Sequence, residues 1–303
     1  MRIGLLEKAA ILPRRHRASY TRGMLHWDTN TIRHSPLFEA LRHHGACGDV
    51  LGGNDWPALA NLQAMVNACG VMSGGGQPLR LVAQSARAGA FEDRYEVRIF
   101  REGALQLRAQ NWHDLFNLLV WMAFPLTKAA INARHYRALL ARQTCGTLNR
   151  GPAQDALTLF DESGVIVLSD DADLLQDVRD FAWKQLFWLR RDRVQKHFHC
   201  IIFGHALYEK ALQPFVGITG RAILLEGGHV LQVSPRSDRE SWSWETLDAR
   251  LAHRVADEAS FLTTRDLAPL PLLGIPGWWP ANRAEDFYDN TAYFRAGRRG
   301  RAA

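Results

Sequence analysis

Apolar residues recur at helical spacing in several segments of this chain. Leu59, Leu62 and Val66 lie three or four positions apart, so the pattern predicts a helix over about 57–69. The same reasoning predicts a short helix around 36–43, within an otherwise irregular first fifty residues. Further helices are expected, in chain order, over residues 126–142, 172–190, 201–212 and 244–260.

The segment that follows Asn111 differs because it is apolar on almost every side. Asn111 is a favourable N-cap residue, and Asp114 three positions later completes a pattern similar to a capping box. A helix without a polar face has to be covered by other elements. We therefore expect a buried central helix that Pro125 ends or kinks.

Three segments rich in β-forming residues surround Gly-containing turns. They predict hairpins over residues 95–107, 156–168 and 221–233. In the second hairpin, Asp161 and Glu162 are interpreted as turn residues. Hairpins that alternate with helices predict an α+β fold, in which an antiparallel sheet built from hairpins packs against several helices.

Three consecutive glycines end the first helical part of the chain. We predict a helical N-terminal layer over residues 1–76, as a domain or as part of one, and a main α+β body over 77–303. This body ends in a proline-rich segment over 267–280, which is expected to form an extended strap across it. The alternative is the wall of a cleft, with Trp278 and Trp279 at its mouth.

The composition gives information on the hydrophobic core, the net charge and the expected cellular location. Of 303 residues, 47% are hydrophobic, and the formal net charge is +6. A basic chain can bind polyanions such as nucleic acid but does not have to. The four cysteines form no CxxC pair, which argues against a zinc ribbon or a disulfide framework. The longest apolar run, over 118–126, is too short to span a bilayer, so we expect a cytoplasmic protein without a membrane partner.

Unusual polar residues lie on the apolar helical segments. His113 and Asn117 are four apart, as are His205 and Glu209, so each pair shares a helix face. An unsatisfied buried polar group costs about 1–3 kcal/mol, so such residues need partners or a function. A His and a Glu on one face can hold a metal, or pair a base with an orienting carboxylate. The alternative is a set of hydrogen-bonded groups that only fix the packing.

A third segment carries a polar stripe formed by Lys128, Asn132 and His135. We interpret Lys128, together with Arg134, as part of a solvated helix face. Asn132 and His135 are less typical surface residues and remain candidates for a site. Asp155 is a further candidate, because it stands at the start of a predicted strand where no turn requires it.

Known motifs restrict the function further. The chain lacks a P-loop, a GxGxxG after a strand and a GxSxG elbow, which argues against an ATPase or an ordinary dinucleotide enzyme. Six ordered segments resemble the bacterial family catalogued as domain of unknown function 3025. These segments are NWHDLFN (111–117), FPLTKAAINARH (124–135), DALTLFDESG (155–164), FGHALYEKAL (203–212), LAPLPLLGIPGWWP (267–280) and FYDNTAYFR (287–295). The resemblance implies one continuous body and no known activity or cofactor.

The leading hypothesis is a hydrolase that acts on a small molecule. Its candidate site residues are His113, Asn117, His135, Asp155, His205 and Glu209. In a metal-dependent version, His113, His205 and Glu209 hold a divalent metal, and Asn117 or Asn132 orients the substrate. In a metal-free version, His205 is the base and Glu209 orients it.

Two other classes of function remain open. A binding module for nucleic acid or a phosphorylated ligand would use an arginine-rich surface. Its residues would be Arg134, Arg137, Arg142, Arg190, Arg191 and Arg193. A purely structural protein would contain the same buried polar residues as satisfied core groups. Whether His113 and His205 converge in space separates these classes.

Overall fold

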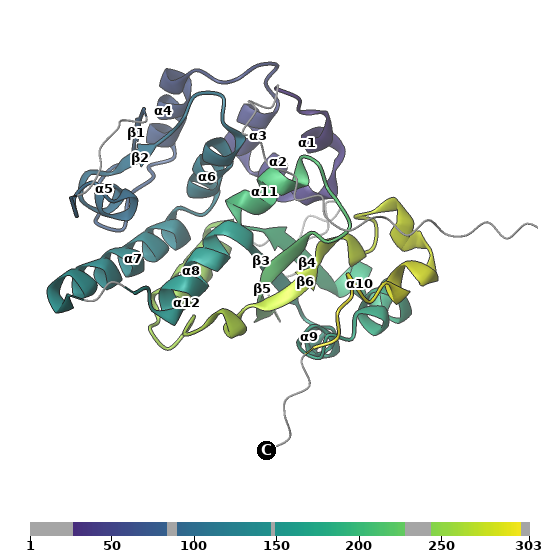
Figure 1. Ribbon diagram of the computed structural model, residues 1–303. Coiled ribbons are helices and arrows are strands. Elements are labelled where there is room, and N and C mark those ends of the chain that lie inside the picture. The colour runs from purple at the N-terminus through teal and green to yellow at the C-terminus, as the bar shows by residue number, and fades with distance from the viewer. Residues whose placement is uncertain (1–26, 84–89, 147–148, 228–243, 298–303) are drawn as a thin grey trace, which may run out of the picture.

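The computed structural model describes residues 27–83, 90–146, 149–227 and 244–297, which form a mixed α+β structure (Figure 1). Its larger sheet has the strand order β4-β3-β5-β6. The strands are β3 (Gly164–Ser169), β4 (Phe198–Ile202), β5 (Thr219–Glu226) and β6 (Ala268–Pro271). β3 is antiparallel to β4 but parallel to β5, and β5 is antiparallel to β6. The α+β class is therefore confirmed, whereas the purely antiparallel sheet is wrong.

The predicted hairpins are the main error. Residues 95–107 form a helix, α5 (Tyr95–Glu102), followed by a short strand, β2 (Ala104–Gln106). β2 pairs in parallel with β1 (Arg80–Val82) in a separate two-stranded sheet. Gly103, at a φ of 65°, adopts the left-handed conformation that ends α5 as a helix C-cap instead of forming a hairpin turn.

The second predicted hairpin is also a helix followed by a strand. Its first arm and its turn belong to α8 (Pro152–Ser163), and its second arm is β3. Pro152 suits the first turn of a helix, and Ala156 and Phe160 lie on its buried face at helical spacing. Of the third hairpin, the first arm is β5, while residues 228–233 lie outside the described residues.

Several predicted helices are confirmed. They are α4 (Leu59–Ala68), α6 (Trp112–Ala123), α7 (Pro125–Cys145) and α12 (Trp244–Ala256). The helix expected over 172–190 is shorter, because α9 (Ala172–Arg179) ends and a separate π-helical turn covers Gln185–Leu189. Helix α10 (Arg191–His197) then leads into β4. The helix predicted over 201–212 is wrong in its first part, which is β4, and correct for α11 (His205–Ala211).

The N-terminal part is more helical than expected. Besides the predicted short helix, now η1 (Pro36–Phe38) and α2 (Glu39–His43), it contains α1 (Asn30–His34) and α3 (Gly45–Leu51). These elements share one hydrophobic core with the sheet and its helices. The ring of Phe38, for example, lies 5.6 Å from that of Tyr208. The division at residue 76 stays a prediction.

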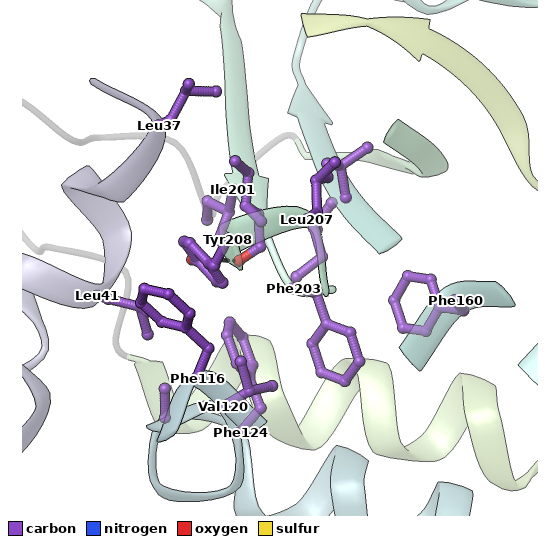
Figure 2. Close-up of a cluster of buried hydrophobic side chains, with 14 of the residues drawn as sticks. Leu37, Leu41, Phe116, Val120, Phe124, Phe160, Ile201, Phe203, Leu207 and Tyr208 are labelled. Carbon is purple, nitrogen blue, oxygen red and sulfur yellow. Dashed lines mark hydrogen bonds between the residues drawn. The ribbon is translucent and has the colours of Figure 1, made fainter. Parts of the chain in front are cut away.

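Helix α6 is buried at the centre, as its sequence predicts. Ten of its twelve residues are buried, and the side chain of Asn111 accepts the N-cap hydrogen bond from the backbone of Asp114. Figure 2 shows Phe116 of α6 beside Tyr208 of α11, and Phe124 beside Phe203. Aromatic contacts of this kind connect α6 to α11 and hold the two helices that carry His113 and His205 in a fixed relation.

The sheet is covered on both sides. In Figure 1, α7, α8 and α12 lie on one side of it, and α9 and α10 lie on the other. All six residues of β3 are buried. The proline-rich segment supplies β6, the edge strand, where Pro269 and Pro271 are tolerated. Within the described chain, no single helix has the length and apolar character to cross a membrane. The pair α6 and α7 passes that test only together, across a bend of 110°.

Candidate metal centre

Three side chains from distant parts of the chain meet beside the sheet. His113 lies in the first turn of α6, Glu162 in the last turn of α8, and His205 begins α11. Each offers one potential ligand atom, and these atoms lie within 4.8 Å of one another. Nε2 of His205 is 3.6 Å from Oε1 of Glu162, and the two imidazole rings lie 4.6 Å apart at 78°. Two imidazoles and a carboxylate are a typical ligand set for a divalent transition metal.

A glycine allows this convergence. A Cβ atom on Gly204 would lie 2.5 Å from the backbone of residues 162–164, closer than a real side chain can approach. The start of α11 can therefore lie directly against the end of α8, held by a hydrogen bond of 2.8 Å from the Gly204 N–H to the Gly164 carbonyl. This contact places His205 next to Glu162.

Each histidine has a carboxylate behind its ring. Nδ1 of His113 donates to Oε2 of Glu209 over 2.9 Å, which leaves Nε2 of His113 available as a ligand. Nδ1 of His205 is buried, has no hydrogen-bond partner among the described residues, and lies 3.8 Å from Oδ2 of Asp161. A carboxylate that accepts a hydrogen bond from the far nitrogen of a histidine is the usual support for a metal ligand. His113 has this support, whereas Asp161 lies too far from His205 for a hydrogen bond. Glu209, which we expected to act with His205, thus supports His113.

The protonation states differ between the two histidines. Burial lowers the pKa of His205 to about 4, so its ring is neutral near pH 7. The hydrogen bond that His113 donates to Glu209 raises the pKa of His113 above its usual value. A metal binds only the neutral imidazole, which is the form that His205 has near pH 7.

Lys128 and Asp161 form a buried pair next to this cluster. Nζ of Lys128 lies 2.5 Å from Oδ1 of Asp161 and 2.9 Å from Oδ1 of Asn117, and Lys128 is only 3% exposed. Burial alone would raise the pKa of Asp161, but the ammonium beside it outweighs burial and lowers that pKa. The interpretation of Lys128 as a surface residue is wrong, as is that of Asp161 and Glu162 as turn residues.

Arg134 is not on a solvated face either. It is 8% exposed, and its guanidinium donates to the carbonyls of Val255, Asp257 and Ser260 over 2.9–3.2 Å. These carbonyls lie at and beyond the end of α12, where helical carbonyls lack partners. Arg134 therefore has a structural role, since it fastens α12 to α7.

Asn132 and His135 lie on α7, and Glu96 lies on α5, which contacts α7. Asn132 is 1% exposed, and its amide donates to Oε2 of Glu96 over 2.8 Å. The pKa of Glu96 is raised to about 7 because the carboxylate is largely removed from solvent. His135 is buried, and burial lowers its pKa to about 4. Glu96 can thus accept or donate a proton near neutral pH.

These residues surround a cavity of about 540 Å³. Four of the predicted site residues line it, namely His113, Asn117, His135 and His205. Asp155 does not: its side chain is 53% exposed and lies 3.6 Å from Arg150. The residues that the sequence analysis missed on this wall are Glu96, Asp161 and Glu162. A helical pattern after Pro152 was the signal that could have placed the last two on α8.

A family model described as Protein of unknown function (DUF3025) matches residues 79–298. The chain belongs to this family. The resemblance seen in the six ordered segments is thereby confirmed, and the matched part includes all three residues of the candidate metal centre. No curated protein and no solved structure matches the chain. The family description names no activity, so the function of this DUF3025 member has to be argued from its site.

Most of the arginines proposed to bind nucleic acid are bound within the fold of this family member. Arg193 is bound to Asp171 at 2.7 Å, and Arg190 to Asp177 at 3.0 Å. Arg191 donates to the carbonyl of Asn282 over 2.8 Å. Of the six arginines, Arg134 and Arg191 are occupied by backbone carbonyls, and Arg137 and Arg142 make neither an ion pair nor a hydrogen bond through their side chains within the described ranges. The geometry therefore gives little support to a basic binding face.

His135 leads to a prediction for the pH dependence of stability. The pKa of His135 is about 4 in the folded protein and 6.5 in the unfolded chain. Between pH 4 and pH 6.5, the unfolded chain therefore binds more protons than the folded protein. The free energy of unfolding should therefore fall as the pH falls from 6.5 to 4, by about 3 kcal/mol from this residue. The measurement is urea unfolding of wild type and His135→Gln across this range.

The comparison of the two proteins isolates His135. Glu96, with its pKa raised to about 7, acts in the opposite direction in part of this range but is present in both. His205 acts in the same direction and is also present in both. The variant should show the shallower fall. Equal slopes in the two proteins would contradict a neutral, buried His135.

Proposed function

We propose that this protein is a hydrolase that depends on a divalent metal, held by His113, Glu162 and His205. The observation that carries the proposal is the convergence of these three side chains on one cavity, with a carboxylate behind each imidazole. Three protein ligands leave a coordination position for water, and a bound metal would lower the pKa of that water so that it can attack a carbonyl or phosphoryl group.

The neighbouring residues suit substrate binding and proton transfer. The amide of Asn117 donates to the hydroxyl oxygen of Tyr95 over 2.7 Å, so the Tyr95 proton is available to a substrate oxygen in the cavity. Glu96, with its pKa of about 7, can act as a general acid that donates a proton to a leaving group at neutral pH. Lys128 and Asp161 keep Asn117 and the wall behind His205 in place.

The test is the metal content of the purified, untagged protein by elemental mass spectrometry. After exposure to zinc, manganese, iron and cobalt in turn, wild type should retain about one ion per chain through dialysis. His113→Ala and His205→Ala should retain none while keeping the wild-type circular dichroism spectrum. His197→Ala is the matched control, because His197 forms a similar pair with Asp170, at 3.0 Å, on the surface.

Activity provides the second part of the test. A panel of ester, amide and phosphoester substrates should include one that the metal-loaded protein hydrolyses. A chelator should abolish that hydrolysis, and the retained metal should restore it. The proposal would be wrong if wild type held no metal under any of these conditions. It would also be wrong if His113→Ala and His205→Ala held metal as well as wild type does.

A further inference from the structure

Most charges on the cavity wall cancel in pairs. The Arg108 guanidinium is bound to Asp114 at both ends, over 2.8 Å to Oδ2 and 2.6 Å to Oδ1. Lys128 is paired with Asp161 at 2.5 Å. Of the other arginines on the wall, Arg142 makes no ion pair among the described residues, and Arg150 makes a long one of 3.6 Å with Asp155. Any further anion that enters the cavity would therefore meet these two arginines.

Arg142 has no counter-ion. It lies on α7, lines the cavity, and makes no ion pair with any residue that the structure describes. Its Nε is buried and has no hydrogen-bond partner among those residues. An unpaired guanidinium on the wall of a cavity favours an anionic ligand, which its terminal nitrogens would bind.

Arg150 and two polar side chains complete the same end of the cavity. Arg150 lies 3.6 Å from Asp155, with both side chains about half exposed, and it donates to the hydroxyl of Thr158. Thr158 accepts that bond, so its own proton is free to be donated. Gln154 is 6% exposed, lines the cavity, and forms no hydrogen bond within the described part of the chain. Four donors of this kind match the oxygens of a phosphate or carboxylate.

The helices separate this end from the candidate metal centre. Gln154, Thr158 and Glu162 lie on one face of α8, and eight residues correspond to about 12 Å at about 1.5 Å per residue. Lys128, at the start of α7, contacts Asp161 near the end of α8, and Arg142 lies near the other end of α7. The end of α8 thus carries Glu162 of the candidate metal centre, whereas Arg142 lies near the other end of α7, and Arg150 lies in the connection between the two helices.

We propose that the substrate carries an oxyanion, a phosphate or a carboxylate group, about 6–12 Å from the bond that is hydrolysed. Arg142 and Arg150 bind this group, with Gln154 and Thr158 as further donors. The inference rests on the proposed function for the reaction at the other end of the cavity. Binding of the oxyanion itself requires no metal, so it can be tested separately.

The experiment is calorimetric titration of metal-free protein with inorganic phosphate and, in a second arm, with succinate. Wild type should bind one of the two in a single site, and the arm that binds identifies the oxyanion. Arg142→Gln should weaken that binding by about tenfold or more, since hydrogen bonds to charged groups contribute more than neutral ones. Arg137→Gln is the matched control, because it removes the same charge from the same helix. Arg137 is exposed and does not line the cavity.

Each result decides the inference. Equal binding by Arg142→Gln and wild type would overturn it, as would the absence of binding in both arms. Arg142→Lys, which keeps the charge but not the planar donor pattern, should fall between wild type and Arg142→Gln. Glu162→Gln should keep the oxyanion binding of wild type. If variants of the metal centre lose the metal but still bind the oxyanion, the two sites are independent. The oxyanion site can then be right even where the proposed metal centre is wrong.

Discussion

Glu162→Gln is expected to lower the affinity for a divalent metal by more than about 100-fold, whereas Glu209→Gln should lower it by about 10- to 100-fold. The reason is the difference in position. Glu162 offers an oxygen within 4.8 Å of both imidazoles and would bind the metal directly. Glu209 accepts a hydrogen bond from Nδ1 of His113 and would act only by orienting that ring.

A competition titration against a chromophoric chelator measures both affinities. Asp155→Asn is the matched control, because Asp155 is a carboxylate on the same helix as Glu162 but does not line the cavity. It should leave the affinity for metal unchanged. If Glu209→Gln lost more affinity than Glu162→Gln, Glu209 would be the direct ligand, as in the set expected from the spacing of His205 and Glu209. If neither variant lost affinity, the assignment of this centre would be wrong.

Lys128→Met is expected to destabilise the fold by about 3–5 kcal/mol, because it leaves a buried carboxylate without its cation. Lys128 is 3% exposed and is bound to both Asp161 and Asn117. The double variant Lys128→Met with Asp161→Asn should regain much of that loss, since no uncompensated charge remains. The two mutations should therefore be strongly non-additive.

Urea unfolding at pH 7 of wild type, both single variants and the double variant gives this coupling. Lys184→Met serves as the control, because Lys184 forms a similar ion pair with Asp289, at 2.8 Å, on the surface. It should change stability little, since exposed ion pairs are screened by water. Additive effects of Lys128→Met and Asp161→Asn would contradict a buried pair. The result also concerns the candidate metal centre, because the same Asp161 side chain lies 3.8 Å from Nδ1 of His205.

The sequence was most informative where one helix face determines the residue pattern. Helix α4 was predicted because its apolar residues follow the helical period, and α6 because Asn111 caps an almost wholly apolar segment. Helices α7 and α12 were predicted as well. His113, Asn117 and His205 were recognised as candidates because a polar residue on an otherwise apolar segment needs a partner. All three line the cavity.

Local sequence signals gave wrong predictions where one residue pattern is compatible with two different structures. Asp161 and Glu162 precede Ser-Gly, which suits a hairpin turn as well as a helix end, and in the structure α8 packs against the sheet as a helix. The parallel pairing of β3 with β5 depends on the path of the chain between them. Lys128 has a typical surface identity, and its burial follows from Asp161, thirty-three positions away.

By itself, the sequence determined the family, the α+β class, the buried central helix and two histidines that were out of place on apolar segments. The tertiary structure alone decided which carboxylates join them. His113 meets Glu209 across ninety-six residues, and Glu162 reaches both histidines because Gly204 lets α11 lie against α8. Periodicity reports the neighbours of a residue within one helix, whereas a site assembled from α6, α8 and α11 depends on contacts that exist only after those helices pack.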